Sequence, residues 1–118
     1  GDGEQTRSFL FIDDCLNGTF DLFKSDYHEP LNIGSEEQVS INQMISIIEE
    51  IASYKVRKNY QLDKPLGVRG RSSDNRLVNK KLDWSPKLNL KQGLELTYSW
   101  IYDQINSGTN INKFTNSY

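Results

Sequence analysis

Two arginines in the stretch Gly67–Asn75 have the residue type and the spacing that suit phosphate binding. Each guanidinium is a planar fork of donors that matches the paired oxygens of a phosphate group. Gly70 is expected to open backbone conformations closed to other residues, so that Arg69 and Arg71 could be aimed at one ligand. The Ser-Ser-Asp run after Arg71 predicts a nearby helix whose positive end would add to the same site. The stretch is therefore a candidate phosphate clamp, and the alternative is a solvated loop with two surface arginines.

A second arginine-bearing segment, Gln5-Thr6-Arg7, lies far from the first in the sequence. Two separate segments that each offer a guanidinium suit a diphosphate, because its charge is carried on two adjacent groups. We therefore expect Arg7 and Arg71 to converge on one pyrophosphate. The ligand class that this arrangement favours is a nucleotide-linked molecule.

The remaining reactive residue types do not form a recognisable catalytic or metal-binding set. His28 and Cys15, the single residues of their kinds, have no partners at a zinc-binding spacing, and one turn histidine does not support a Ser-His-Asp set. Tyr54 and Lys58 have the Y-x-x-x-K spacing of a helical proton-transfer pair, but their segment is interpreted as a helix end passing into a strand. The chain also has no glycine-rich strand-to-helix turn for a dinucleotide. We interpret the Tyr54–Lys58 spacing as a coincidence.

Composition limits the classes of partner. The chain has 118 residues, a single-domain length, and a formal net charge of −2, which argues against general nucleic-acid binding and requires any anion site to be local. The single cysteine excludes an internal disulfide and makes a reducing cytosol the expected location. No apolar run approaches the length of a membrane span, so no membrane association is expected.

The first third of the chain is expected to contain two short strands around a helix. The apolar run Phe9–Ile12 predicts a buried strand or an extended segment, and Leu31–Gly34 predicts another brief strand. Between them, Asp13 is expected to cap a helix that begins at Asp14 and ends near Ser25. Its apolar stripe is formed by Leu16, Phe20, Phe23, Cys15 and Leu22.

The later elements have clearer boundaries. Ser40 with Gln43 and Asn89 with Gln92 have the spacing of capping boxes, which predicts one helix through Ile51 and another through Ile105. Alternation over residues 54–62 predicts a strand with one solvated face, and residues 74–82 predict a short helix with Leu77 and Leu82 inward. Residues 107–118 form an expected disordered tail after a binding portion spanning residues 1–106. This is an α/β pattern whose strands are too few and too short for a free-standing parallel sheet, so they are expected to complete a sheet lying mostly elsewhere.

Several segments together resemble the C-terminal part of the GDP-mannose 3,5-epimerases, a group within the extended short-chain dehydrogenase/reductase family. The likeness runs from Gly1 to about Ile105 and is carried by Gly1–Phe9, Phe11–Asp13, Asn32–Ser35, Gly67–Arg71, Ser73–Asn75 and Trp84–Pro86. The Q-T-R and V-R-G-R-x-S-D-N wording is specific to these epimerases. The G-D-G-x-Q-x-R and W-x-P wording is shared with other nucleotide-sugar epimerases and dehydratases.

The resemblance implies roles for four residues of this sequence. Gln5, Thr6 and Arg7 match the Q-T-R segment that contacts the GDP-sugar, and Arg71 matches the arginine that binds the diphosphate. Ser72 stands where the family usually has Asn, a departure that leaves the arginines unchanged. The resemblance assigns no catalytic, cofactor-binding or metal-binding residue to this chain.

The resemblance also implies a division of labour within a longer protein. It places the NAD-binding glycine motif, the catalytic Tyr and Lys, and the Cys/Lys acid-base pair upstream of this chain, so that the Rossmann-type core is largely absent and the chain is not competent alone. The complete enzyme would convert GDP-D-mannose to GDP-L-galactose, with NAD oxidising the sugar at C4 and the C3 and C5 protons then exchanging. It is expected to be a cytoplasmic homodimeric isomerase of ascorbate biosynthesis. The alternatives are another nucleotide-sugar epimerase or dehydratase, or a non-catalytic, truncated interaction module.

Overall fold

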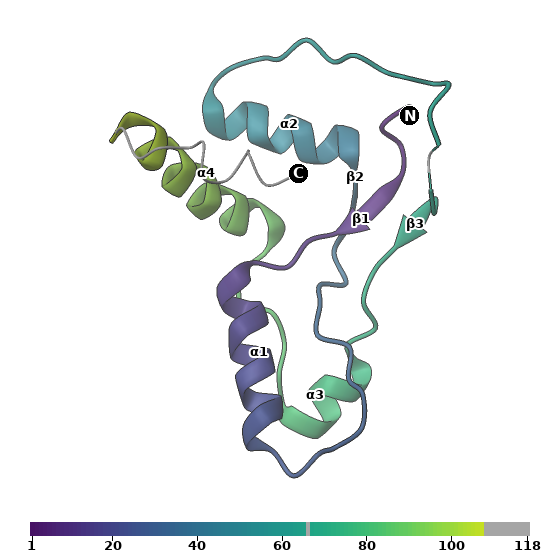
Figure 1. Cartoon of the computed structure of the whole chain (residues 1–118), viewed down its shortest axis with the longest axis vertical. Coiled ribbons are helices and arrows are strands. Elements are labelled where there is room, and N and C mark those ends of the chain that lie inside the picture. The colour runs from purple at the N-terminus through teal and green to yellow at the C-terminus, as the bar shows by residue number, and fades with distance from the viewer. Residues whose placement is uncertain (66, 108–118) are drawn as a thin grey trace.

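The computed structural model describes residues 1–65 and 67–107, which form a small three-stranded sheet and four helices (Figure 1). The predicted tail lies outside these residues, apart from Ser107. In chain order the elements are β1 (Thr6–Ser8), α1 (Ile12–Lys24), β2 (Gln38–Ser40), α2 (Ile41–Ala52), β3 (Gly70–Arg71), α3 (Arg76–Leu82) and α4 (Leu90–Asn106).

The sheet is mixed and has the strand order β2-β1-β3. β1 pairs with β2 in the antiparallel direction and with β3 in the parallel direction. The central strand therefore carries one predicted arginine segment, and an edge strand carries the other. No strand in the described part of the chain exceeds three residues, as expected for a sheet too small to stand alone.

Both predicted capping boxes are confirmed. At the start of α2, the Gln43 amide donates to the Ser40 hydroxyl at 3.1 Å, and the Ser40 amide donates to the Gln43 side chain at 2.7 Å. Asn89 and Gln92 make the same reciprocal pair at the start of α4. Each box satisfies two amides that a helix N-terminus otherwise leaves unpaired, which explains why these two helix starts could be located from sequence.

The predicted cap of α1 is wrong. The helix begins at Ile12, its N-cap is Phe11, and no side chain caps it. Asp14 is instead buried, and its Oδ2 atom accepts from the amides of Lys87 and Leu88, at 3.1 Å each. The carboxylate thus fixes the loop before α4 onto α1, a long-range role that local sequence spacing does not reveal. The C-terminal end at Ser25 is confirmed.

The strands predicted at residues 31–34 and 54–62 are wrong, and residues 9–11 do not form the strand that was one of the two alternatives there. Residues 9–11, 31–34 and 54–62 have no regular structure, and the observed strands are β1, β2 and β3. A strand needs a hydrogen-bonding neighbour, and sequence periodicity alone does not supply one. In the segment 54–62 the alternating apolar residues, which were expected on the buried face, are in fact solvent-exposed: Val56, Tyr60 and Leu62.

The core of the described chain is small. Val78 is fully buried, and Trp84 and Leu90 are almost so. In α3 the inward residue is Val78, whereas Leu77, predicted to point inward, is 43% exposed. Trp84 packs against α1 at Gly18, where an added Cβ would lie 2.7 Å from the indole Cε2 atom. Burial of the Trp84 indole therefore joins α1 to the loop that follows α3. This loop runs beside α1 in Figure 1.

The chain is open for its size. Its radius of gyration is 17.0 Å, whereas a compact domain of this length has about 13.5 Å. Its accessible surface is 9012 Å², against about 6,600 Å² for a compact protein of its mass. Much of the excess is apolar, because the α1 stripe faces solvent through Ile12, Leu16, Phe20 and Phe23. Within the described ranges no helix is long and apolar enough to cross a membrane.

Candidate functional site

The sheet brings the two predicted arginines to adjacent positions. Arg7 of β1 and Arg71 of β3 are register partners in a parallel pair. Register partners on neighbouring strands project to the same face, and neighbouring strands lie about 4.8 Å apart. The two segments that sequence spacing singled out, more than sixty residues apart, thus meet side by side.

Arg7 also lies against the loop that leads into β3. An added Cβ on Gly67 would come within 4.0 Å of the Arg7 Nη2 atom. Gly67 has φ +66°, a left-handed conformation that favours glycine. The half-buried Arg7 donates from Nη1 to the carbonyl oxygen of Thr6 at 2.6 Å. One of its five N–H donors is therefore engaged by this bond, while Arg71 is exposed.

Gln5 directly precedes β1, and Thr6 is the first residue of that strand. Thr6 is the register partner of Gly70. Because side chains alternate along a strand, the Thr6 side chain lies on the face of the sheet opposite to Arg7 and Arg71. The Gln5 side-chain oxygen is shielded from solvent and makes no hydrogen bond within the described residues. A shielded acceptor without a donor is costly, by about 1–3 kcal/mol, so an approaching N–H or O–H group would be favoured there.

The conformational role predicted for Gly70 is wrong, and Gly67 has it instead. Among the described glycines only Gly3 and Gly67 have positive φ. Gly70 is needed for a different reason, since a Cβ there would come within 2.8 Å of the Thr6 hydroxyl oxygen. The missing side chain lets β3 approach β1 closely, and this approach sets Arg71 beside Arg7.

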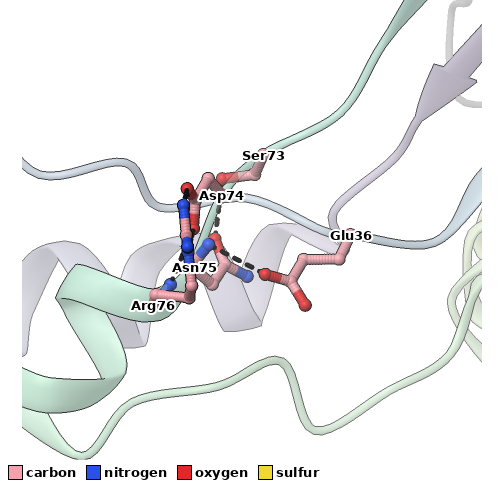
Figure 2. A network of polar contacts seen from close by, with 5 residues as sticks. All are labelled: Glu36, Ser73, Asp74, Asn75 and Arg76. Atoms are coloured by element: carbon pink, nitrogen blue, oxygen red, sulfur yellow. Dashed lines mark hydrogen bonds and ion pairs between the residues drawn. The ribbon is translucent and has the colours of Figure 1, made fainter.

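The helix after the arginines does not direct a free positive end at them. α3 begins at Arg76, two residues later than predicted, and Figure 2 shows how carboxylates occupy its start. Glu36 accepts from the Asn75 amide at 2.9 Å, and Asp74 accepts from the Arg76 amide at 3.1 Å. The expected helix-dipole contribution to the phosphate site is therefore wrong, because acidic side chains already use these N–H groups.

The same network fixes the course of the chain beyond Arg71. The Asn75 side chain donates to the carbonyl oxygen of Gly34 at 2.7 Å. It also accepts from the Ser73 hydroxyl at 2.6 Å (Figure 2). Asp74 and Arg76 form an ion pair, and the hydrogen bond from Arg76 lowers the pKa of Asp74 from 3.8 to about 2. Arg76 is thus neutralised locally and is not a candidate for ligand binding.

One feature that indicates an anion site was missed at the sequence level. Residues 53–71 contain six of the 14 basic residues and one of the 16 acidic residues, although the whole chain is acidic. Counting charges in windows, rather than over the whole chain, would have found this local excess. Three of these basic residues form ion pairs, Lys55 with Glu49, Lys64 with Asp63 and Arg69 with Asp2. The excess positive charge of this segment is therefore carried by Arg57, Lys58 and Arg71.

Two other site types find no support in the geometry. Tyr54 and Lys58 both lie beyond the end of α2, so they are not one turn apart on a helix as a proton-transfer pair would be. Within residues 1–65 and 67–107, no group of three or more His, Cys, Asp or Glu residues could hold a metal ion.

Comparison with known proteins confirms the resemblance inferred from the motifs. The chain is 50% identical over 105 residues to the GDP-mannose 3,5-epimerase of Arabidopsis thaliana, a match covering 89% of this chain and 28% of that protein. It is 33% identical over 106 residues to the UDP-glucuronate 4-epimerase of Thermodesulfobacterium geofontis, covering 89% of this chain and 33% of that protein. No protein-family model matches. The chain thus spans about a third or less of these relatives.

Solved structures of nucleotide-sugar epimerases share the fold and confirm its α/β class. The UDP-glucuronic acid 4-epimerase of Bacillus cereus, in complex with UDP-glucuronic acid and NAD, superposes with a TM-score of 0.80 and 36% identity, covering 87% of this chain and 34% of that one. The UDP-glucose 4-epimerase of Thermotoga maritima with UDP-glucose gives a TM-score of 0.83 at 28% identity, covering 89% and 34%.

Proposed function

We propose that this chain belongs to the nucleotide-sugar epimerases and dehydratases of the extended short-chain dehydrogenase/reductase family, and that it binds the nucleotide-sugar substrate of such an enzyme. Its similarity to these proteins over most of its own length supports the proposal. The proposed enzyme is a GDP-mannose 3,5-epimerase, an isomerase that converts GDP-D-mannose to GDP-L-galactose. In this proposal Arg7 and Arg71 bind the diphosphate, and Gln5 and Thr6 contact other parts of the GDP-sugar, Thr6 from the face of the sheet opposite to the arginines.

The register pairing of Arg7 with Arg71 is the observation that supports this proposal most strongly. Two guanidinium groups on adjacent strands repel one another, and this repulsion is relieved when an anion with two charged groups lies between them. A diphosphate meets that requirement, whereas a neutral sugar does not. Charge-assisted bonds of this kind would hold the sugar in a fixed orientation, which can contribute several kcal/mol to catalysis.

The choice of GDP-mannose rests on sequence similarity. Identity to the plant GDP-mannose 3,5-epimerase is 50%, against 33% for the bacterial UDP-glucuronate 4-epimerase. The second candidate is therefore another epimerase or dehydratase that acts on a UDP- or dTDP-sugar. Competition binding with GDP-, UDP- and dTDP-sugars distinguishes the two, and preference for a UDP-sugar would favour the second.

The residues of this chain do not fit a dinucleotide site, so we assign NAD binding to polypeptide outside it. A dinucleotide fold needs a glycine-rich turn between a strand and a helix. Here β1 leads to α1 through Phe9–Phe11, and β2 runs directly into α2 through Ser40. When bound elsewhere in the enzyme, NAD would supply the oxidation and reduction at the sugar. We further propose that the complete enzyme is a cytoplasmic homodimer and that this chain alone is inactive.

Calorimetric titration of the intact enzyme with GDP-mannose tests the proposal. Replacing Arg71 by alanine should cost about 1.5–3 kcal/mol of binding free energy, the typical value for a charge-assisted hydrogen bond. Arg57→Ala is the matched control, because Arg57 is exposed in the same basic segment but lies outside the sheet. An unchanged affinity in Arg71→Ala, or an equal loss in Arg57→Ala, would show that the diphosphate is bound elsewhere.

A further inference from the structure

The Asn42 side chain joins three segments of the chain that lie around the arginine strands. In the first turn of α2, its Nδ2 atom donates to the carbonyl oxygen of Asp2 at 3.1 Å and to the Glu4 carboxylate at 2.6 Å. Its Oδ1 atom accepts from the Tyr60 hydroxyl at 2.9 Å. One amide group thus connects α2, the loop before β1, and the long connection between α2 and β3.

The contacts continue from Asn42 to the strand that carries Arg71. Asp2 is held by Asn42 through its carbonyl oxygen, and its carboxylate forms an ion pair with Arg69 at 3.3 Å. The Arg69 carbonyl oxygen in turn accepts from the Thr6 amide at 2.9 Å, which pairs β3 with β1. The Asp2 carboxylate is therefore fixed between the site of Asn42 and the residue that enters β3.

The backbone around Asn42 is shaped to admit this side chain. Gly3 has φ +77°, and a Cβ there would lie 2.4 Å from the Asn42 Oδ1 atom. The Asn42 amide also donates to the Gly3 carbonyl oxygen at 3.0 Å. An amide side chain offers two donors and an acceptor, and all three functions are used here. Aspartate has nearly the same shape but lacks the donors, so it cannot replace Asn42.

We propose that Asn42 is a positioning residue for the diphosphate site. It touches neither arginine, yet it fixes the loop before β1 and the connection before β3, and so it keeps Arg7 and Arg71 in register. This inference rests on the proposed function, because the alignment of Arg7 with Arg71 is measured through the affinity for the diphosphate. It predicts that loss of Asn42 weakens binding of the phosphate groups and leaves binding of the nucleoside unchanged.

The experiment compares GDP with guanosine, using titrations of the intact enzyme and its Asn42→Asp variant. The variant removes both donors and places a second carboxylate against Glu4. GDP affinity should fall about five- to tenfold, as expected for the loss of one or two hydrogen bonds, while guanosine affinity should stay within about twofold. Amide hydrogen exchange at Thr6, which bonds to Arg69, should accelerate. Asn17→Asp adds the same charge at an exposed position of α1, and it should change neither the GDP affinity nor the guanosine affinity.

A second variant and a parallel measurement make every outcome decisive. Tyr60→Phe removes a single bond to Asn42 and should lower the GDP-to-guanosine affinity ratio about two- to threefold, even if Asn42→Asp does not fold. An unchanged ratio in the variants that fold would overturn the inference, including when Thr6 exchange is faster, because Asn42 would then be structural only. Arg71→Ala reports on the proposed function separately: if it leaves the ratio unchanged, the diphosphate site itself is wrong.

Discussion

At the scale of single residues, acidic side chains hold the loops while the arginine pair remains available. Asp14, Glu36 and Glu37 each accept hydrogen bonds from loop or helix-start amides that are distant in sequence. Helix starts leave amides without intrahelical partners, and a carboxylate satisfies them with a charge-assisted bond. These three acidic residues thus hold loops and helix starts in place, whereas the proposed ligand contacts include the two arginines.

Asp14 and Asp13 form a matched pair that tests this division. Asp14→Ala leaves the amides of Lys87 and Leu88 without their acceptor and should cost about 1–3 kcal/mol, whereas exposed Asp13→Ala should stay within about 0.5 kcal/mol. Hydrogen exchange at the two amides is the direct measurement. Equal protection in Asp14→Ala and in the unchanged chain would contradict the role assigned to Asp14.

The Asp74 carboxylate should be protonated at a lower pH than an ordinary aspartate. The hydrogen bond from Arg76 lowers its pKa from 3.8 to about 2, so the charged pair stabilises the fold above pH 4 and is lost as the pH falls toward 2. An NMR titration of the Asp74 carboxyl carbon should therefore give a midpoint near pH 2. In Arg76→Ala the midpoint should return toward the usual value, and a midpoint that does not move would rule out Arg76 as the cause.

At the scale of elements, the sequence predicted the helix starts that are fixed by hydrogen bonds between residues close in the chain. The starts of α2 and α4 follow from Ser40–Gln43 and Asn89–Gln92, because a capping box is complete within four residues. Strands depend on partners, so residues 54–62 alternate without forming one, and Gly70–Arg71 form one without alternation. α1 starts at Ile12 without a side-chain cap, and Asp14 is used instead in a long-range contact with the loop before α4.

Gly18 provides a test of packing between elements. In an exposed helix, replacing glycine by alanine stabilises by about 0.5–1 kcal/mol. In α1, however, the new methyl group would lie within 3 Å of both Trp84 and Ile33, so Gly18→Ala should destabilise by about 1–3 kcal/mol. Gly93→Ala in α4 meets Phe11 at 3.3 Å or more and should be milder. Urea unfolding measures both variants, and a stabilised Gly18→Ala would contradict this packing.

At the scale of the whole molecule, the open shape indicates apolar surface that packs against another domain. The surface excess over a compact protein is accompanied by the exposed α1 stripe and by an apolar groove of about 550 Å³ between residues 9–12 and α4. Large exposed apolar surface marks an interaction site. The coverage of a third or less of each relative agrees with a partner domain that would bury it.

The isolated chain is therefore expected to self-associate. Sedimentation at increasing concentration should reveal oligomers, and Phe20→Glu with Phe23→Glu, which removes two of the most exposed stripe residues, should reduce them. Ser46→Glu on an exposed position of α2 is the control. A monomeric chain that unfolds cooperatively would count against a missing covering domain.

The candidate site was predictable in its residues but not in its geometry. Guanidinium chemistry and motif wording identified Arg7 and Arg71, yet only the parallel register makes them neighbours. The supporting residues Gly67 and Asn42 act through a left-handed turn and long-range hydrogen bonds, which no spacing rule encodes. The sequence therefore predicted the candidate residues, and the fold supplied their arrangement.

A structure of the intact enzyme with GDP-mannose bound would test this arrangement most directly. We expect the guanidinium groups of Arg7 and Arg71 to lie about 2.7–3.2 Å from oxygens of the same diphosphate, on one face of the sheet. A diphosphate bound away from both residues, or contacted by only one of them with the other on the opposite face, would contradict the account.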